Sequence, residues 1–478
     1  MPARPLRLRG LALAAMGCVV LAVAGPGSPA LAAPAGSAAK PRPVSPWPAA
    51  GTPQLVKNLG RTQVIRQLVQ CGNTMYAVGR FTRIAWKRHT YLRTNAFSFS
   101  ATAPYRVTSW HPEVNGEVNS IAFDGAHCAN AYIGGKFTKV GRTKAANIAE
   151  IRTSTGAVVR RFRHDASNTV NTLAVARGRH LLVGGHFGKI NGSTTRFMVS
   201  LNPVTGRDDR FIRLNISGHY HFCSGKYHRC SDGFPTEVFN QQLSHNGRFD
   251  LAEGVFTSVG GRSRQQIFML NLTTKRATVT GWTSPQFDGS KAGGHRYPYQ
   301  CFWTESFYLR SAAWSPDDSM IYTAETGFHP WNLPVRHHLR TGLCDASAAW
   351  PAVHQPVRDI WISYTGCDSL YSVAADSRAV YVAGHPRWAN NPGGCDFRGH
   401  GAVPDEGLQG LSPRNGRVLR NASGRAGRYS MSPANADTML ITRAGLWIGS
   451  TNRLKSKLCG GAGGHAGICF LRYPRRHG

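Results

Sequence analysis

A short phrase that combines an apolar strand, one or two glycines and an aromatic ring recurs along the chain and constrains the fold more than any other feature. Its copies are YAVGRF (76–81), YIGGKF (132–137), LVGGHF (182–187) and LAEGVF (251–256), followed by the less complete YTAETG (322–327), YVAGHP (381–386) and LWIGST (446–451). Successive copies start roughly 50–70 residues apart. Repeats of this length with strand signals are typical of propellers and solenoids.

Each copy is flanked by further strand signals. An alternating segment precedes it, as in EVNSIAF (117–123), and another apolar segment follows it, as in NIAEIR (147–152). The turn STGA then leads to a fourth segment, VVRRF (158–162). Four antiparallel strands in each of seven copies predict an all-β chain folded as a seven-bladed β-propeller. In this interpretation the glycines let adjacent backbones approach, and the aromatic ring fills the space between blades.

The two ends of the repeat array are complementary. The last copy carries only three strand signals, whereas a spare strand-like segment, residues 54–59, precedes the first copy. We therefore expect the N-terminal strand to complete the last blade and to close the ring.

One unit shows the repeat most fully. Residues 131–156 contain GG-x-F-T-x-V, then N-I-A-x-I, then a T-G turn. This pattern resembles the bacterial delta-sixty-repeat propeller proteins of the secreted actinobacterial type. The resemblance implies a fold and no single chemistry, so it assigns no catalytic residue.

The N-terminus has the organisation of an export signal. Three arginines precede the apolar run 11–24, and the small residues 30–32 form a cleavage site. We predict a signal peptide over 1–32, a Pro/Ala-rich linker over 33–51 and the propeller over 52–478. No later apolar run reaches 18 residues, so the sequence predicts a secreted protein without a transmembrane span.

Ten cysteines follow the signal peptide, an even number that suggests five disulfides in an exported chain. Pairing cysteines that fall on the same face of the propeller predicts the bonds Cys71–Cys128, Cys223–Cys230, Cys301–Cys344, Cys367–Cys395 and Cys459–Cys469. Four of these tie down loop insertions on the face formed by the loops after each second strand. Long loops on a rigid scaffold usually serve recognition, so we take this looped face as the binding face.

The formal charge is +33, which favours polyanionic partners. No nucleic-acid-binding motif is present, so an anionic glycan or cell-wall polymer is the expected partner. A basic composition shared by many proteins of a GC-rich organism explains the charge equally well.

The candidate binding residues form two sets on the looped face. Cationic or protonatable side chains follow the glycines of four copies, at Arg80, Lys136, His186 and His385. Tryptophans suited to stacking on sugar rings occur in the insertions, at Trp303, Trp331 and Trp388. Solvated strand ends and small loop cores are the alternative explanations of the two sets.

Catalysis is neither predicted nor excluded by these residues. The histidines match no established metal site, so we predict no metal and no cofactor. The leading hypothesis is a secreted, monomeric, non-catalytic module that binds an anionic polymer. The alternatives are a polysaccharide lyase or hydrolase, a quinone-dependent oxidoreductase, and a protein-interaction platform.

Overall fold

The computed structural model describes residues 43–56, 62–125, 127–224, 229–287, 308–326, 343–366, 368–394, 397–419, 436–452 and 467–474. Residues 41–478 form one compact unit. Its described elements are strands, apart from one short 3₁₀ helix, η1 (Pro285–Phe287). The prediction of an all-β chain is therefore confirmed. No described helix is long and apolar enough to cross a membrane.

Seven sheets, numbered here one to seven in chain order, carry the repeated phrases. Sheets one to three are β2 (Val64–Cys71), β3 (Thr74–Arg80) and β6 (Ala96–Ser100); β7 (Glu117–Phe123), β8 (Asn130–Lys136) and β11 (Ile148–Arg152); and β12 (Val170–Ala176), β13 (His180–Gly185) and β14 (Met198–Leu201). Sheets four and five are β18 (Glu237–Leu243), β19 (Phe249–Val255), β22 (Ile267–Asn271) and β23 (Thr278–Val279); and β24 (Tyr308–Trp314), β25 (Met320–Thr326), β26 (Ala346–Pro351) and β27 (Trp361–Tyr364). Sheets six and seven are β28 (Leu370–Ala375), β29 (Val380–Gly384) and β32 (Leu408–Leu411); and β33 (Ala436–Thr442), β34 (Gly445–Ser450) and β35 (Ile468–Arg472).

Shorter strands form small accessory sheets. They are β1 (Gln54–Leu55), β4 (Arg83–Trp86) and β5 (His89–Leu92); β9 (Lys139–Val140) and β10 (Thr143–Lys144); β15 (Ile216–Ser217), β20 (Ser258–Val259) and β21 (Arg262–Ser263); β16 (Tyr220–Ser224) and β17 (Arg229–Phe234); and β30 (Trp388–Ala389) and β31 (Val403–Pro404).

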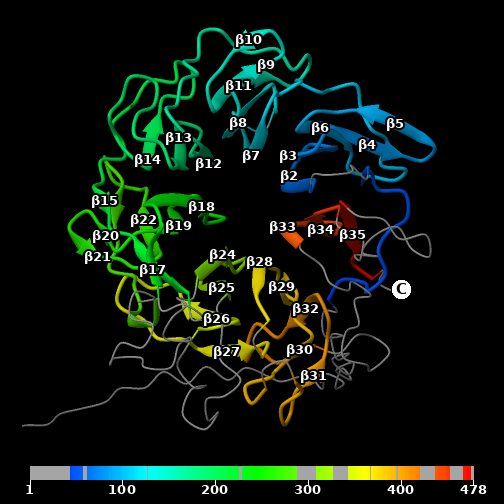
Figure 1. The fold of residues 1–478 in the computed structure, drawn as a ribbon, viewed down its shortest axis with the longest axis vertical. Helices are drawn as coiled ribbons and strands as arrows, with labels where there is room; N and C mark the ends of the chain where they lie inside the picture. The colour runs from blue at the N-terminus through cyan, green and yellow to red at the C-terminus, as the bar shows by residue number, and fades with distance from the viewer. Residues whose placement is uncertain are drawn as a thin grey trace, which may run out of the picture. The chain divides into compact units, whose positions relative to one another are not determined.

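The first strands of the seven sheets lie around a common centre (Figure 1). Each contacts the first strand of the next sheet, and β33 of sheet seven contacts β2 of sheet one. Seven buried apolar clusters hold the sheets together, each drawn mainly from two neighbouring sheets. Trp447 and Phe470 of sheet seven, for example, pack with Phe97 and Phe99 of sheet one. This arrangement is of the β-propeller type, with the core between the sheets.

The prediction of four strands in every sheet is wrong. In the described residues only sheets four and five have four strands. In sheets one, two, three and six the expected fourth strand is reduced to single bridges, Phe99↔Val107, Ile151↔Val158, Leu201↔Asp208 and Leu411↔Val418. In sheet two the segment passes through the exposed Arg160 and Arg161 directly after the bridge, and only then reaches the buried Phe162.

The N-terminal segment meets sheet seven mainly through residues before the predicted strand 54–59, of which 57–59 lie outside the described residues. The backbone N–H groups of Ser45 and Ala49 donate to the carbonyls of Arg472 and Phe470 in β35. Strand β1 pairs instead with β4, and only Gln54 also bridges to Gly467. The chain therefore packs against sheet seven within the range predicted for the linker.

Each first strand contains a β-bulge close to its start. The strand register shifts around one residue in every sheet, and these seven bulge residues are Arg66, Asn119, Asn171, Phe239, Arg310, Tyr371 and Asp437. The residue before each bulge is buried, whereas the bulge residue itself retains exposure. A bulge redirects a side chain without ending the ladder, so all seven turn toward the centre.

The bulges explain the second glycine of the phrase. Gly135 lies opposite Val118, just before the bulge of β7, and a Cβ added to it would overlap the carbonyl oxygen of Glu117. Gly134 instead abuts Val170 of sheet three, as expected for a close approach between neighbouring sheets. The second glycine of the phrase therefore leaves room for the backbone at the bulge of its own sheet, and the first leaves room for a side chain of the next sheet.

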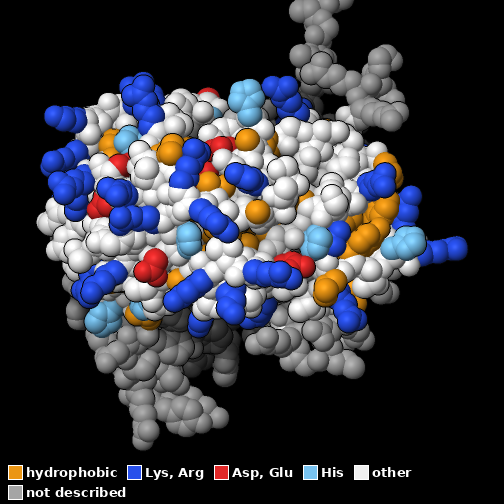
Figure 2. All heavy atoms as spheres, turned by 90° about the horizontal axis from the view of Figure 1, so that it is seen from above, with side chains coloured by type: hydrophobic (Ala, Val, Ile, Leu, Met, Phe, Trp, Pro, Cys, Tyr) orange, Lys and Arg blue, Asp and Glu red, His pale blue; other side chains and the backbone are white. Residues whose placement is uncertain are grey.

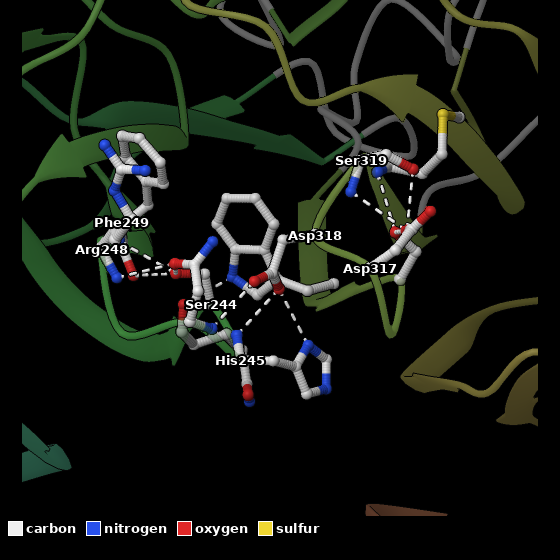
Figure 3. Close-up of polar contacts among 12 residues, drawn as sticks. Ser244, His245, Arg248, Phe249, Asp317, Asp318 and Ser319 are labelled. Carbon is white, nitrogen blue, oxygen red and sulfur yellow. Dashed lines mark hydrogen bonds and ion pairs between the residues drawn. The ribbon is translucent and has the colours of Figure 1, made fainter.

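Sheets four and five are also joined at the turns after their first strands (Figure 3). Asp318, in the β24–β25 turn, accepts hydrogen bonds from the turn 244–248 between β18 and β19. Trp314 adds a hydrogen bond from its indole Nε1 to the carbonyl of Gln242, at 2.9 Å. These bonds fix one sheet against the next at this end.

The disulfide Cys71–Cys128 is present as predicted and links sheet one to sheet two. Cys344 and Cys469 are also disulfide-bonded. Their predicted partners, Cys301 and Cys459, lie outside the described residues, as do Cys367 and Cys395. The β16–β17 register places residues 223 and 230 directly opposite each other.

Candidate functional site

The seven bulge residues line a central cavity of about 540 Å³. They come from one strand of each sheet, so the cavity wall is assembled from the whole ring of first strands. Its chemistry is mixed, because the bulge residues comprise two arginines, one aspartate, two asparagines and two aromatic residues.

Ion pairs neutralise one side of this cavity. Arg66 Nε lies 2.7 Å from Glu117 Oε1, and Arg66 Nη1 lies 3.2 Å from Asp437 Oδ1. Arg80 Nη1 is 3.7 Å from the other oxygen of Glu117. On another side, Glu237 Oε2 accepts a hydrogen bond from Asn171 Nδ2 at 2.8 Å. The cavity therefore does not present a uniformly cationic wall.

Arg310 differs from Arg66. None of the ion pairs between described residues involves it, and its guanidinium lies 5.4 Å from the ring centroid of Tyr371. Arg310 is exposed to solvent and lines the cavity. Partial desolvation of its guanidinium lowers the pKa of Arg310, while Tyr371 and Asp437 act in the opposite direction. A cation–π contact of this kind leaves the guanidinium N–H groups available as donors.

The four predicted rim residues have different environments. Lys136 lines the central cavity, but Arg80 is held in the pair with Glu117. His385 Nδ1 is 3.9 Å from Asp368 Oδ1, and its ring packs against Tyr371. His186 has a buried Nδ1 that finds no hydrogen-bond partner in the part of the chain that the structure describes.

Of the three predicted tryptophans, only Trp388 can be placed. It lies in β30, with the guanidinium of Arg387 4.6 Å from its ring centroid. Arg387 also binds Asp368 through Nε and Nη2, so it holds Trp388 next to an ion pair. Trp303 and Trp331 lie outside the described residues.

Buried carboxyl groups occur away from the cavity. Asp405, after β31, is buried, and this burial raises its pKa to about 8. Burial also raises the pKa of Glu253 in β19 to about 8. Such groups are neutral over most of the physiological range, so they add no negative field at pH 7. Among the described residues, no group of three or more His, Cys, Asp or Glu is arranged to hold a metal ion.

One group of exposed cations lies on sheet two. A groove of about 910 Å³ runs past the outer edge of this sheet, and four arginines line it: Arg142, Arg152, Arg160 and Arg161. All four are exposed, and none takes part in an ion pair between described residues. Glu113 is the one carboxylate in the lining, and it lies 3.9 Å from His111, which also lines the groove.

Small residues and turns shape the groove. Gly156 adopts a positive φ of 76°, and a Cβ there would clash with Pro112 on the opposite wall. Trp110 Nε1 donates to the carbonyl of Arg152, fixing the turn that carries this arginine. The β9–β10 hairpin presents Arg142. Hydrogen bonds therefore hold two of the segments that carry these arginines, namely the turn at Arg152 and the β9–β10 hairpin.

Figure 2 looks onto the molecule from above Figure 1, toward the side where β8 to β11 lie. Lys and Arg side chains are spread over this side, with few Asp and Glu between them. The residues at which we predicted binding on the looped face are not among the described residues that line this groove. The pair RR at 160–161, next to a T-G turn, was the available signal.

No known protein-family profile matches the sequence, and no curated protein matches it. Among solved structures, the chain is similar to the computationally designed protein Ika8, at 10% identity, with a TM-score of 0.42 and coverage of 87% of this chain and 99% of that chain. It is also similar to the WD40 β-propeller domain of Doa1, at 12% identity, with a TM-score of 0.39 and coverage of 83% and 94%.

Proposed function

We propose that the protein is a secreted, monomeric, non-catalytic binding module whose seven sheets are the blades of one propeller. Its partner is an extended anionic polymer, such as a teichoic acid or an acidic polysaccharide. The polymer binds along the groove of sheet two. The observation that carries this proposal is the set of four exposed arginines, none of which forms an ion pair between described residues, although Arg152 and Arg161 interact electrostatically with Glu150.

The unequal use of charge supports this placement. Arg66 is already paired with Glu117 and Asp437, and Arg80 with Glu117, so an anion could bind these two guanidinium groups only by breaking those pairs. Arg142 and Arg160 form no ion pair between described residues, so an anion can bind them without breaking one. Their guanidinium groups suit bidentate recognition of carboxylate or phosphate oxygens.

Export is supported by the disulfide Cys71–Cys128, because such bonds persist in oxidising compartments. The delta-sixty-repeat assignment stays a proposal that rests on the motif at 131–156.

The test is retention on immobilised teichoic acid, polygalacturonate and a neutral glucan over a salt gradient. We expect the protein to bind at least one anionic polymer at physiological salt, where the Debye length is about 8 Å. Replacing Arg142, Arg160 and Arg161 together by Gln should weaken binding about tenfold, since three exposed contacts of roughly 0.5 kcal/mol are lost.

The matched control replaces Arg207, Arg276 and Arg414 by Gln. These arginines are also exposed, lie outside the groove and change the net charge equally. If both triple variants lose the same affinity, the overall charge of +33 is responsible and the groove is not the site.

A further inference from the structure

The central cavity is a second place where a ligand fits, and its chemistry differs from that of the groove. At about 540 Å³ it is within the usual range for small-molecule sites, roughly 300–1,000 Å³. It is lined by side chains from all seven first strands, and a site built on strands is held more rigidly than one on loops.

Most of the lining offers neutral hydrogen-bonding groups. Asn119, Asn171 and Asn240 provide amides, and Ser311 and Thr172 provide hydroxyls. Phe239 and Tyr371 add two aromatic rings that are only partly buried. Amides with aromatic faces suit a ligand that carries both hydroxyl groups and C–H faces, as a sugar ring does.

Arg310 and Lys136 are the two cations of the lining that take part in no ion pair between described residues. Arg66 forms ion pairs with two carboxylates, whereas Arg310 lies against the face of Tyr371 and is also influenced by the charge of Asp437. A guanidinium in a confined space is a strong and geometrically selective donor to a carboxylate.

We propose that the central cavity binds a sugar acid of monosaccharide size, with its carboxylate at Arg310 and its ring among Tyr371, Phe239 and the asparagines. The site is independent of the groove on sheet two, which takes a polymer.

The test uses calorimetric titration of the full mature chain with glucuronate and galacturonate, each compared with its neutral parent sugar. We expect saturable binding of at least one acid, at least about tenfold tighter than the parent sugar, since the pair differs only in the carboxylate. The same triple replacement at Arg142, Arg160 and Arg161 should leave this binding unchanged, which separates the cavity from the groove.

Arg310→Gln should weaken binding of the acid to the level of the parent sugar, whereas Lys136→Gln, at another cation of the same cavity, should change it less than about threefold. Equal binding of acid and parent sugar, no binding of either acid, or loss on Lys136→Gln but not on Arg310→Gln would overturn the proposal. Because the comparison of acid with parent sugar needs no variant, it decides the question even if Arg310→Gln fails to fold.

Discussion

The side-chain carboxylate of Asp318 bonds to both the backbone N–H and the imidazole ring of His245, which lies in a turn of the neighbouring sheet. Asp318 Oδ1 accepts from the His245 backbone N–H at 2.8 Å and lies 2.9 Å from His245 Nδ1, while Oδ2 accepts from the Asn246 N–H at 2.9 Å (Figure 3). The carboxylate therefore caps a turn that belongs to another sheet. Its own backbone has a positive φ of 58°, which Asn also tolerates.

Asp318→Asn should lower the free energy of unfolding by about 1–3 kcal/mol, because one of the two carboxylate acceptors is lost. His245→Ala should cost less, since the two backbone N–H bonds remain. Urea unfolding measures both, with Glu113→Gln as an exposed carboxylate-to-amide control that is expected to change stability by less than about 0.5 kcal/mol. Equal effects of Asp318→Asn and this control would mean that the contact between sheets four and five contributes no stability.

Gly135→Ala should be among the most destabilising single changes in the chain, by about 3 kcal/mol or more, because the added Cβ overlaps the carbonyl oxygen of Glu117 at the bulge. Gly188→Ala is the matched control, since the nearest atom to its added Cβ is 4.0 Å away. Thermal unfolding of the two variants should separate them clearly. Similar melting temperatures would show that the bulge can relax at little cost.

Stability should fall as the pH rises from about 4.5 to about 8. Burial raises the pKa of Glu253 from its ordinary 4.5 to about 8, so the folded state holds a proton that the unfolded state has released over this interval. Asp405 and Glu150, with pKa values raised by burial to about 8 and about 7, act in the same direction. Below about 4.5 both states are protonated, and above about 8 both are ionised, so the contribution of Glu253 levels off at each end.

Glu253→Gln isolates this contribution. The amide oxygen can still accept from the Ala312 N–H, which lies 3.0 Å from Glu253 Oε1. The variant should therefore lose less stability than the parent protein between pH 5 and pH 9 in urea unfolding. An identical pH dependence in the two proteins would show that Glu253 does not titrate as its burial suggests.

Removing the disulfide should weaken the junction of sheets one and two. Cys71 and Cys128 are 57 residues apart, and opening a loop of that size costs about 4 kcal/mol in the chain-entropy description. The double variant Cys71→Ser/Cys128→Ser should show this loss in equilibrium unfolding. A change below about 1 kcal/mol would contradict the chain-entropy description and would indicate that the unfolded chain is already restricted without this bond.

The sequence predicted the repeat well because its signal is local. Tyr76, Tyr132, Leu182 and Leu251, which were aligned as equivalent, lie in the middle of β3, β8, β13 and β19. Even the shorter phrases that begin with Tyr322, Tyr381 and Leu446 lie in the corresponding strands β25, β29 and β34. A run of apolar residues ending in glycine carries this information without reference to any distant residue.

The site could not be predicted in the same way, because its residues meet only through tertiary structure. The bulge at Asn119 depends on the register of two paired strands, which the sequence of one strand does not specify. Arg142 and Arg160 belong to a hairpin and to the segment after β11, and only the fold brings them to one groove. The fourth strand was overpredicted because VVRRF has strand propensity, while the structure pairs it only briefly with β11.

At each bulge, the residue that lines the central cavity is not one of the residues that pair in the strand ladder. A bulge residue makes no ladder pair in its own sheet, and its side chain points away from the apolar layers between sheets. Substitutions at those bulge positions that make no bond to a neighbouring sheet, unlike Arg66, Asn119 and Asn171, would change the cavity lining while the strand ladders stay intact. In evolution or in protein engineering, the ligand could be changed through a few separated positions, one in each repeat, while the rest of the sequence stays the same.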